Sequence, residues 1–254
     1  MRSGTGHSIG LATKPVGRRQ SSVGAPPESD GSDRYLDDPE SGDRCYGPSD
    51  DLQAYTRPTV PIEWTRFADD HRVAYETPPL DESLVVAGQG HVDLWLQVGS
   101  IDTAVQATIT EIRSDGTEQR VQCGWHRPVH RVEDSDRSDH LRVDYTFTAE
   151  DREALDPGEV LNFRLPLMPF THVFRAGSRL RVAVSTPGRD MPMWNFENPI
   201  SEGSSHAVLR GGERASRLVL PIWPDGPDAP EPAAAEALRG QPHRPAEPIH
   251  NREG

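Results

Sequence analysis

The chain has 254 residues, of which 34% are hydrophobic and 46 are glycine or proline (22 and 24). This load of turn formers is typical of a loop-rich all-β domain with irregular flanks. A net charge of −13 argues against nucleic-acid binding, because no basic stripe is available to neutralise phosphates. No stretch approaches the roughly 20 apolar residues of a membrane span, and the N-terminus lacks an apolar signal core. We therefore expect a cytoplasmic protein with neither nucleic-acid nor membrane partners.

The first part of the chain reads as irregular. Residues 1–32 are rich in Gly, Ser, Pro and Arg without periodicity, which predicts a disordered linker. Residues 33–70 stay irregular but gain anchors such as Tyr35 and Trp64. We expect this second segment to pack on the neighbouring domain or on a partner.

One short motif in the first segment fits a catalytic pattern. Gly6-His-Ser-Ile-Gly10 matches Gly-x-Ser-x-Gly, the nucleophile elbow of serine hydrolases. That elbow needs a buried strand before the serine and a helix after it. No strand signal precedes the motif, and Pro15 and Gly17 follow where the helix should run. The sequence therefore predicts that Ser8 is not a nucleophile.

Residues 71–223 consist of short alternating segments separated by turn signals, without a convincing amphipathic helix. This pattern predicts a jelly-roll β-sandwich. Asp115-Gly116 marks a hairpin, and Ile112 falls out of phase, which suggests a bulge nearby. Residues 224–254 are rich in Pro, Ala and charge and are expected to form a disordered tail. The expected strands cover residues 73–77, 84–87, 91–98, 105–113, 118–123, 141–147, 159–167, 179–185, 207–210 and 217–220.

The stretch Thr171–Ser185 reads as a glycine turn that leads into a buried strand. Gly177 can adopt a backbone angle that other residues resist. Leu180, Val182 and Val184 then alternate with Arg179, Arg181 and Ala183. The aliphatic face is expected to point inward, and the other face is expected to meet solvent or a partner.

Histidines and acidic residues cluster without a metal-binding pattern. His126 and His130 are four positions apart, but Pro128 lies between them and the segment reads as a strand end and loop. His140 lies nearby without a matching acidic ligand. The loop from Glu133 to Asp136 resembles a loose calcium loop, but the spacing does not match. We expect hydrogen-bonded or exposed histidines and a solvated charge run.

Four tryptophans could stack on sugar rings, although core or interface packing is the favoured interpretation. They are Trp95, Trp125, Trp194 and Trp223. Asp190–Trp194 reads as an apolar loop that covers either a neighbour or its own sandwich. Cys45 and Cys123 form no metal or redox motif, and Cys123 is expected to be a small buried hydrophobe. A disulfide between these two cysteines stays open at this point.

Several motifs, in order, resemble the C-terminal jelly-roll domain of the X-prolyl dipeptidyl-peptidase and cocaine-esterase-like serine hydrolases of peptidase family S15. This resemblance covers about residues 33–223 and implies a galactose-binding-domain-like sandwich. Ser178 and Ala104 stand where the family commonly has histidine and aspartate. The motifs are Asp33–Pro39, Thr77–Leu96, Thr110–Gly116, His172–Val182, Asn195–Pro199 and Ser216–Ile222.

The resemblance implies an accessory role rather than chemistry. The family's catalytic α/β-hydrolase domain has no counterpart in this sequence, and a triad needs all three groups oriented together. We expect no catalytic residue, no cofactor and no metal in this chain. The expected function is a non-catalytic domain that helps to wall the substrate pocket of a dipeptidyl-peptidase or esterase and aids association. Its partner would be a separately encoded hydrolase domain or a second copy. The alternative is a free-standing carbohydrate- or ligand-binding jelly roll.

Overall fold

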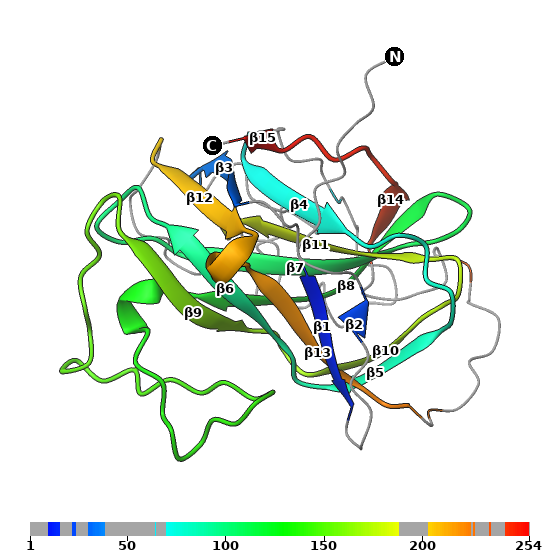
Figure 1. Ribbon diagram of the computed structural model, residues 1–254, viewed down its shortest axis with the longest axis horizontal. Coiled ribbons are helices and arrows are strands. Elements are labelled where there is room, and N and C mark those ends of the chain that lie inside the picture. Colours follow the sequence, from blue (N-terminus) through cyan, green and yellow to red (C-terminus); the bar gives the residue numbers. More distant parts are fainter. Residues whose placement is uncertain are drawn as a thin grey trace, which may run out of the picture.

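The computed structural model describes residues 10–15, 22–23, 30–38, 64, 70–187, 203–224, 226, 234 and 242–253. Within these ranges two mainly antiparallel sheets pack face to face around one hydrophobic core (Figure 1). The predicted all-β sandwich is confirmed.

The larger sheet has the order β10-β5-β13-β6-β12-β3-β15. Strand β9 also pairs with β6, and β1 runs parallel beside β13 and pairs with β2. The strands are β1 (Gly10–Pro15), β2 (Ser22–Val23), β3 (Gly31–Leu36), β5 (Leu84–Gly88), β6 (His91–Gln97), β9 (Val160–Pro166), β10 (Phe170–Phe174), β12 (Ser205–Arg210), β13 (Arg217–Ile222) and β15 (Arg252–Glu253).

The second sheet has five strands in the order β14-β8-β7-β11-β4. Two short 3-10 helices, η2 (Pro128–His130) and η3 (Gly212–Arg214), follow β8 and β12. The strands of this sheet are β4 (Arg72–Glu76), β7 (Val105–Ile112), β8 (Thr117–His126), β11 (Arg179–Ser185) and β14 (His243–Pro245).

The core lies where the inward faces of the two sheets meet. Leu94 and Leu96 of β6 are completely buried and belong to the same cluster as Ile109 of β7 and Leu180 of β11. In β6 the leucines alternate with less buried neighbours, as the two-residue repeat of a strand requires, whereas β7 is buried along its whole length. The strand expected over residues 91–98 is present as β6, and the inward aliphatic face predicted for β11 is confirmed.

The hairpin predicted at Asp115-Gly116 is present between β7 and β8. Gly116 has a φ of +85°, and the Asp115 carboxylate accepts the Thr117 backbone N–H at 2.8 Å. The bulge expected near Ile112 is wrong in position. The register between β7 and β8 shifts between Ile109 and Thr110, where β8 carries the extra residue.

A strand expected over residues 141–147 is not formed. This segment lies in the loop 127–159, whose single bridge pairs Glu133 with Tyr145. Phe147 has a φ of +51°, in the left-handed region, which no strand residue adopts. The alternating pattern instead reflects side chains of the loop itself, such as Val143 and Tyr145, which point toward the sandwich and are buried.

Regular structure also occurs in the segments that were expected to be irregular. Strands β1 and β2 fall within residues 1–32, and β3 extends into residues 33–70 and pairs with β12. The strand signal of β3 is hidden because its buried Asp33 is polar. The Asp33 carboxylate accepts hydrogen bonds from the Tyr75 hydroxyl at 2.9 Å and from Arg210 Nε at 3.0 Å.

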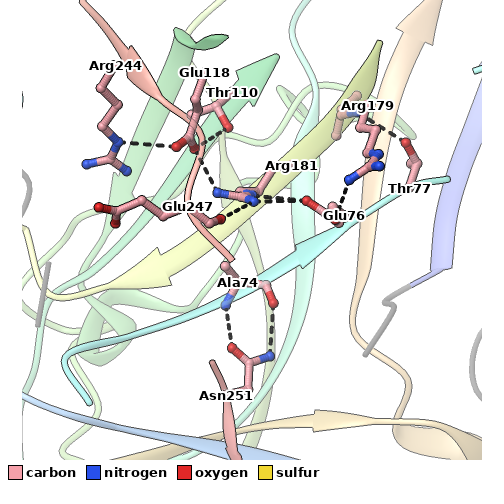
Figure 2. Close-up of polar contacts among 11 residues, drawn as sticks. Ala74, Glu76, Thr77, Thr110, Glu118, Arg179, Arg181, Arg244, Glu247 and Asn251 are labelled. Atoms are coloured by element: carbon pink, nitrogen blue, oxygen red, sulfur yellow. Dashed lines mark hydrogen bonds and ion pairs between the residues drawn. The ribbon is translucent and has the colours of Figure 1, made fainter. Parts of the chain in front are cut away.

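The outer face of β11 differs from the expectation. Arg181 was expected to meet solvent or a partner, but it is only 3% exposed. Its guanidinium contacts Glu76 and Glu118 and donates to the Glu247 carbonyl oxygen (Figure 2). Glu247 belongs to the segment 242–253, which was expected to be a disordered tail and instead packs on the sheet. The chain's own C-terminal segment covers this face.

Candidate docking surface

The loop 127–159 projects from the sandwich between β8 and β9 (Figure 1). One ion pair lies within the loop and another joins it to β9. Arg131 Nη2 lies 2.7 Å from Glu153 Oε2, and the Arg164 guanidinium of β9 binds the Glu133 carboxylate through two nitrogens. Arg164 also donates to the Asp139 carbonyl oxygen at 2.6 Å. Polar contacts within the loop and with β9 therefore fasten the loop to the sandwich.

An aromatic cluster underlies this loop. The His126 ring at the end of β8 stacks on Tyr145 with centroids 4.0 Å apart, and Phe163 of β9 lies 5.5 Å away. The Tyr145 hydroxyl donates to the Arg164 carbonyl oxygen at 2.5 Å. Burial, aided by the nearby His130, lowers the pKa of His126 to about 3. His126 is therefore a neutral packing group at physiological pH.

Two large apolar side chains remain exposed at this loop, one beside the aromatic cluster and the other where the loop contacts the segment after β6. Phe147 is 63% exposed, although its ring lies 5.9 Å from Tyr145 and 5.8 Å from His130. Ile101 is 70% exposed, and its carbonyl oxygen accepts the Leu155 N–H, which places it against the same loop. Left-handed backbone at a phenylalanine costs energy and persists only where the surroundings fix it. Ile101 and Phe147 are two separately exposed apolar side chains at the loop 127–159, and together we call them the apolar patch.

The histidines and acidic residues singled out by the sequence do not assemble a metal site. Among the described residues, no group of three or more His, Cys, Asp or Glu side chains could hold a metal ion. His126 packs in the aromatic cluster, and His140 is exposed. Glu133 is paired with Arg164 rather than directed into a cation loop.

The described tryptophans do not form a shared platform for a sugar. Trp95 lies on β6 of the larger sheet, with the Arg214 guanidinium 6.0 Å from its ring centre. Trp125 lies on β8 of the second sheet, and its indole N–H donates to Gln106 Oε1 at 2.6 Å. Trp223 is half-exposed just after β13. Trp194 and the loop 190–194 lie outside the described residues.

The other residues singled out by the sequence are one serine and two cysteines, and the described residues show no catalytic arrangement around them. Ser8 lies outside the described residues, and the segment that follows it is strand β1 rather than the helix of a nucleophile elbow. Cys123 is buried, as expected, and its sulfur accepts a hydrogen bond from Arg120 at 2.9 Å. Cys45 also lies outside the described residues, so the question of a disulfide with Cys123 stays open.

A buried polar network that sequence reasoning missed joins β3 to the rest of the sandwich. The Asp37 carboxylate accepts hydrogen bonds from Thr186 at 2.6 Å and from Thr103 at 3.0 Å. His206 Nδ1 accepts the Gly99 N–H, so its Nε2–H faces Asp37 at 3.3 Å. The only sequence signal was Asp37 within the aspartate-proline motif. The network anchors the segment that enters the domain.

A second missed network fixes the turn between β10 and β11. The buried Glu111 carboxylate lies 2.9 Å from His172 Nε2 and accepts the Arg175 N–H at 3.2 Å. Ser178, at the position where the related family commonly has histidine, also hydrogen-bonds to Glu111. Burial raises the pKa of Glu111, but these hydrogen bonds outweigh it and hold the pKa below its usual value. Gly177 completes the turn with a φ of +81°.

In the described part of the chain, no helix has both the length and the apolar character required to cross a bilayer. Curated proteins with similar sequences include "Putative serine esterase Mb1866c" of Mycobacterium bovis and "Putative serine esterase MT1883" of Mycobacterium tuberculosis. Each is 29% identical over 160 residues, which cover 62% of this chain and 25% of the relative. The chain thus spans about a quarter of the length of these relatives.

Solved structures show the same fold. A CocE/NonD family hydrolase from Staphylococcus aureus, SACOL2612, matches 86% of this chain and 37% of its own, with a TM-score of 0.56 and 19% identity. An aminopeptidase from a marine sediment Thaumarchaeota archaeon matches 85% of this chain and 36% of its own, with a TM-score of 0.53 and 21% identity. Residues 9–219 match the model of the X-Pro dipeptidyl-peptidase C-terminal non-catalytic domain. The chain therefore belongs to this family of non-catalytic domains.

Proposed function

We propose that this chain is the accessory β-sandwich of a serine hydrolase of the dipeptidyl-peptidase or esterase class, and that it docks on the catalytic domain through the apolar patch. The observation that carries the proposal is the match of residues 9–219 to a non-catalytic domain. Relatives of which this chain covers only about a quarter are named as serine esterases. The remaining length of such a relative is sufficient for a catalytic domain of ordinary size.

The apolar patch supports this role. Phe147 and Ile101 are mostly exposed, and full burial of a phenylalanine or isoleucine contributes about 1.5–3 kcal/mol each. The ion pairs of Arg164 and Arg131 hold the loop before any partner arrives. A preorganised loop loses little conformational entropy on docking. A hydrolase domain with an apolar recess would bury the patch and receive one wall of its substrate pocket.

The test uses the complete chain and the product of the neighbouring reading frame in the source genome, for which the proposal expects a hydrolase domain with a Ser-His-Asp triad. This chain alone should not hydrolyse 4-nitrophenyl butyrate or an X-Pro 4-nitroanilide. Mixed with the hydrolase domain, it should form a complex in light scattering and raise the rate of hydrolysis.

The variant Phe147→Asp should weaken this complex at least tenfold, because a carboxylate would be buried without a partner. Trp223→Asp is the matched control, since Trp223 is also an exposed aromatic but lies after β13, outside the patch. A neighbouring frame without a hydrolase domain, or equal binding by both variants, would count against the proposal.

A further inference from the structure

The final described segment, residues 242–253, crosses the outer side of the second sheet from one edge to the other, and we call it the C-terminal clasp (Figures 1 and 2). Prolines occupy positions 242, 245 and 248. Proline fixes φ near −65°, and this spacing favours an extended chain over a helix. A segment that is already extended loses little conformational entropy when it docks on a sheet.

The clasp adds to the first edge of the sheet by backbone hydrogen bonds. Strand β14 pairs antiparallel with the start of β8. The Arg120 N–H donates to the Pro242 carbonyl oxygen at 2.9 Å, and the Ala246 N–H donates to the Gly116 carbonyl oxygen at 2.8 Å. This is the geometry by which a sheet edge binds a separate extended peptide.

Two arginines join the middle of the clasp to the sheet. Arg244 Nε donates to Glu118 Oε2 at 3.2 Å, and its guanidinium lies 3.8 Å from the centre of the Trp64 ring. Glu118 is 1% exposed and also accepts from Thr110 at 3.0 Å. Arg181 of β11, 3.3 Å from Glu118, donates to the Glu247 carbonyl oxygen at 2.8 Å. Through these contacts the second sheet binds one arginine side chain and one backbone carbonyl group of the clasp.

The clasp then reaches the opposite edge of the second sheet, and its last two residues form β15 and pair with β3 of the larger sheet. The Asn251 amide binds both backbone groups of Ala74 in β4: Oδ1 accepts the N–H at 2.9 Å and Nδ2 donates to the carbonyl oxygen at 2.9 Å (Figure 2). An amide side chain thus takes the place of a neighbouring strand. Aspartate, which cannot donate, would satisfy only half of this pair.

From these contacts we propose that the outer side of the second sheet is a binding groove for an extended peptide, occupied in this chain by its own C-terminal clasp. The groove recognises an arginine that reaches Glu118 and an asparagine seven positions later that pairs with Ala74. Backbone pairing along β8 supplies sequence-independent affinity, and these two side chains supply specificity. This groove is independent of the apolar patch and of any hydrolase partner.

The experiment uses the full-length chain and a fluorescent synthetic peptide with the sequence of residues 242–253. Arg244→Ala combined with Asn251→Ala removes both specific contacts and should release the clasp. The peptide should bind this double variant saturably and at least tenfold more tightly than it binds the unchanged chain, whose groove is filled. A peptide that carries the same two alanines should not bind.

The matched control is Arg252→Ala. Arg252 also belongs to the clasp, but its side chain is exposed and pairs only with the surface residue Asp70 among the described contacts, at 3.4 Å. This variant should exclude the peptide as the unchanged chain does. Hydrogen exchange gives an independent reading: the Ala246 and Arg120 amides should exchange at least tenfold faster in the double variant than in the control.

The proposal is overturned if the double variant fails to bind the peptide or if the unchanged chain binds it equally well. It is also overturned if the Ala246 amide of the unchanged chain exchanges as fast as in a free peptide. Should the double variant lose the fold, Asn251→Ala alone, which keeps the Arg244 contacts, provides the same comparison by peptide binding and hydrogen exchange.

Discussion

The loop 127–159 and the C-terminal clasp both cover the sandwich and both use polar contacts, but only the loop is also packed on a cluster of aromatic rings. Stacked aromatic rings beneath the loop and ion pairs at its base fix it, and it presents Phe147 to solvent. The clasp is bound through Arg244, Asn251 and backbone hydrogen bonds. One segment turns apolar surface outward, and the other satisfies polar groups of the sheet.

This difference separates a surface that can still gain energy from a partner from a surface whose polar groups are already paired within the chain. An exposed apolar side chain still has hydrophobic free energy to gain from a partner. A buried carboxylate such as Glu118, once paired and hydrogen-bonded, gains nothing further and is destabilised if a partner group leaves. The loop is thus the surface suited to a second domain, and the clasp makes the second sheet self-contained. The following changes test each half of this contrast.

The largest expected effect concerns His126, beneath the loop. Its pKa is about 3 in the folded chain, against 6.5 when exposed. As pH falls from 6.5 toward 3, the unfolded chain binds a proton on His126 that the folded chain does not, so the free energy of unfolding falls. The loss reaches up to about 5 kcal/mol across this window.

His126→Phe should flatten this acid slope, because phenylalanine keeps the ring contact with Tyr145 and cannot be protonated. Urea denaturation at intervals from pH 7.5 to 4 provides the measurement. His140→Phe, at an exposed histidine, should keep the slope of the unchanged chain. If His126→Phe retained the full slope, burial of His126 in the aromatic cluster would not be the cause of the loss of stability in acid.

The next effect tests the clasp side. Arg181→Ala leaves Glu118 buried with one fewer cation and removes the donor to the Glu247 carbonyl oxygen. Loss of one partner from a buried ion pair costs about 3–5 kcal/mol, measured as a lower urea midpoint. Arg179→Ala is the control, two residues away on the same face, half-exposed and paired with Glu76 at 3.3 Å. It should cost about 0–1 kcal/mol, and equal losses would mean that the clasp does not bury Arg181.

The contrast also explains which features the sequence could reveal. Alternation located the strands around Leu94 and Leu180, because an inward face must be apolar. It could not show that the outward Arg181 is buried, since its cover comes from a proline-rich segment with no strand signal of its own. Alternation misled at residues 141–147, where burial of Tyr145 beneath a loop gave a strand-like pattern.

The family marker motifs were visible for a different reason. The turn between β10 and β11 requires a positive φ at position 177, and this backbone conformation favours glycine there. The networks around Asp37 and Glu111 were not predictable, because their partners lie far apart in the chain. The exposure of Phe147 was not predictable either, because the alternating pattern of residues 141–147 indicated a strand and not the left-handed backbone found at Phe147.

A smaller effect is expected at Glu111. This residue belongs to a polar network that is separate from both the loop 127–159 and the clasp. Glu111→Gln keeps the shape but removes the charge that His172 and Ser178 bind, at a cost of about 2 kcal/mol at neutral pH. Because the pKa of Glu111 is lowered in the folded chain, this stabilisation is present above the usual glutamate pKa. It is lost as pH falls through the folded value.

The cost of Glu111→Gln should therefore shrink in strongly acidic solution, and urea midpoints at neutral and acidic pH test it. Glu82→Gln, at an exposed glutamate of the same sandwich, should change the midpoint little at either pH. A cost that does not depend on pH would show that packing, rather than charge, holds the turn at Gly177.

The smallest effect isolates the strain behind the apolar patch. Phe147→Gly and Phe147→Ala both remove the ring, but only glycine adopts a φ of +51° without steric cost. The glycine variant should be about 1 kcal/mol more stable than the alanine variant, the reverse of the usual order, by urea denaturation. Both should lose affinity for the hydrolase domain equally, because binding depends on the ring and not on the backbone. If alanine were the more stable, the left-handed backbone would carry no strain, and the exposed phenylalanine would no longer indicate a surface maintained at an energetic cost.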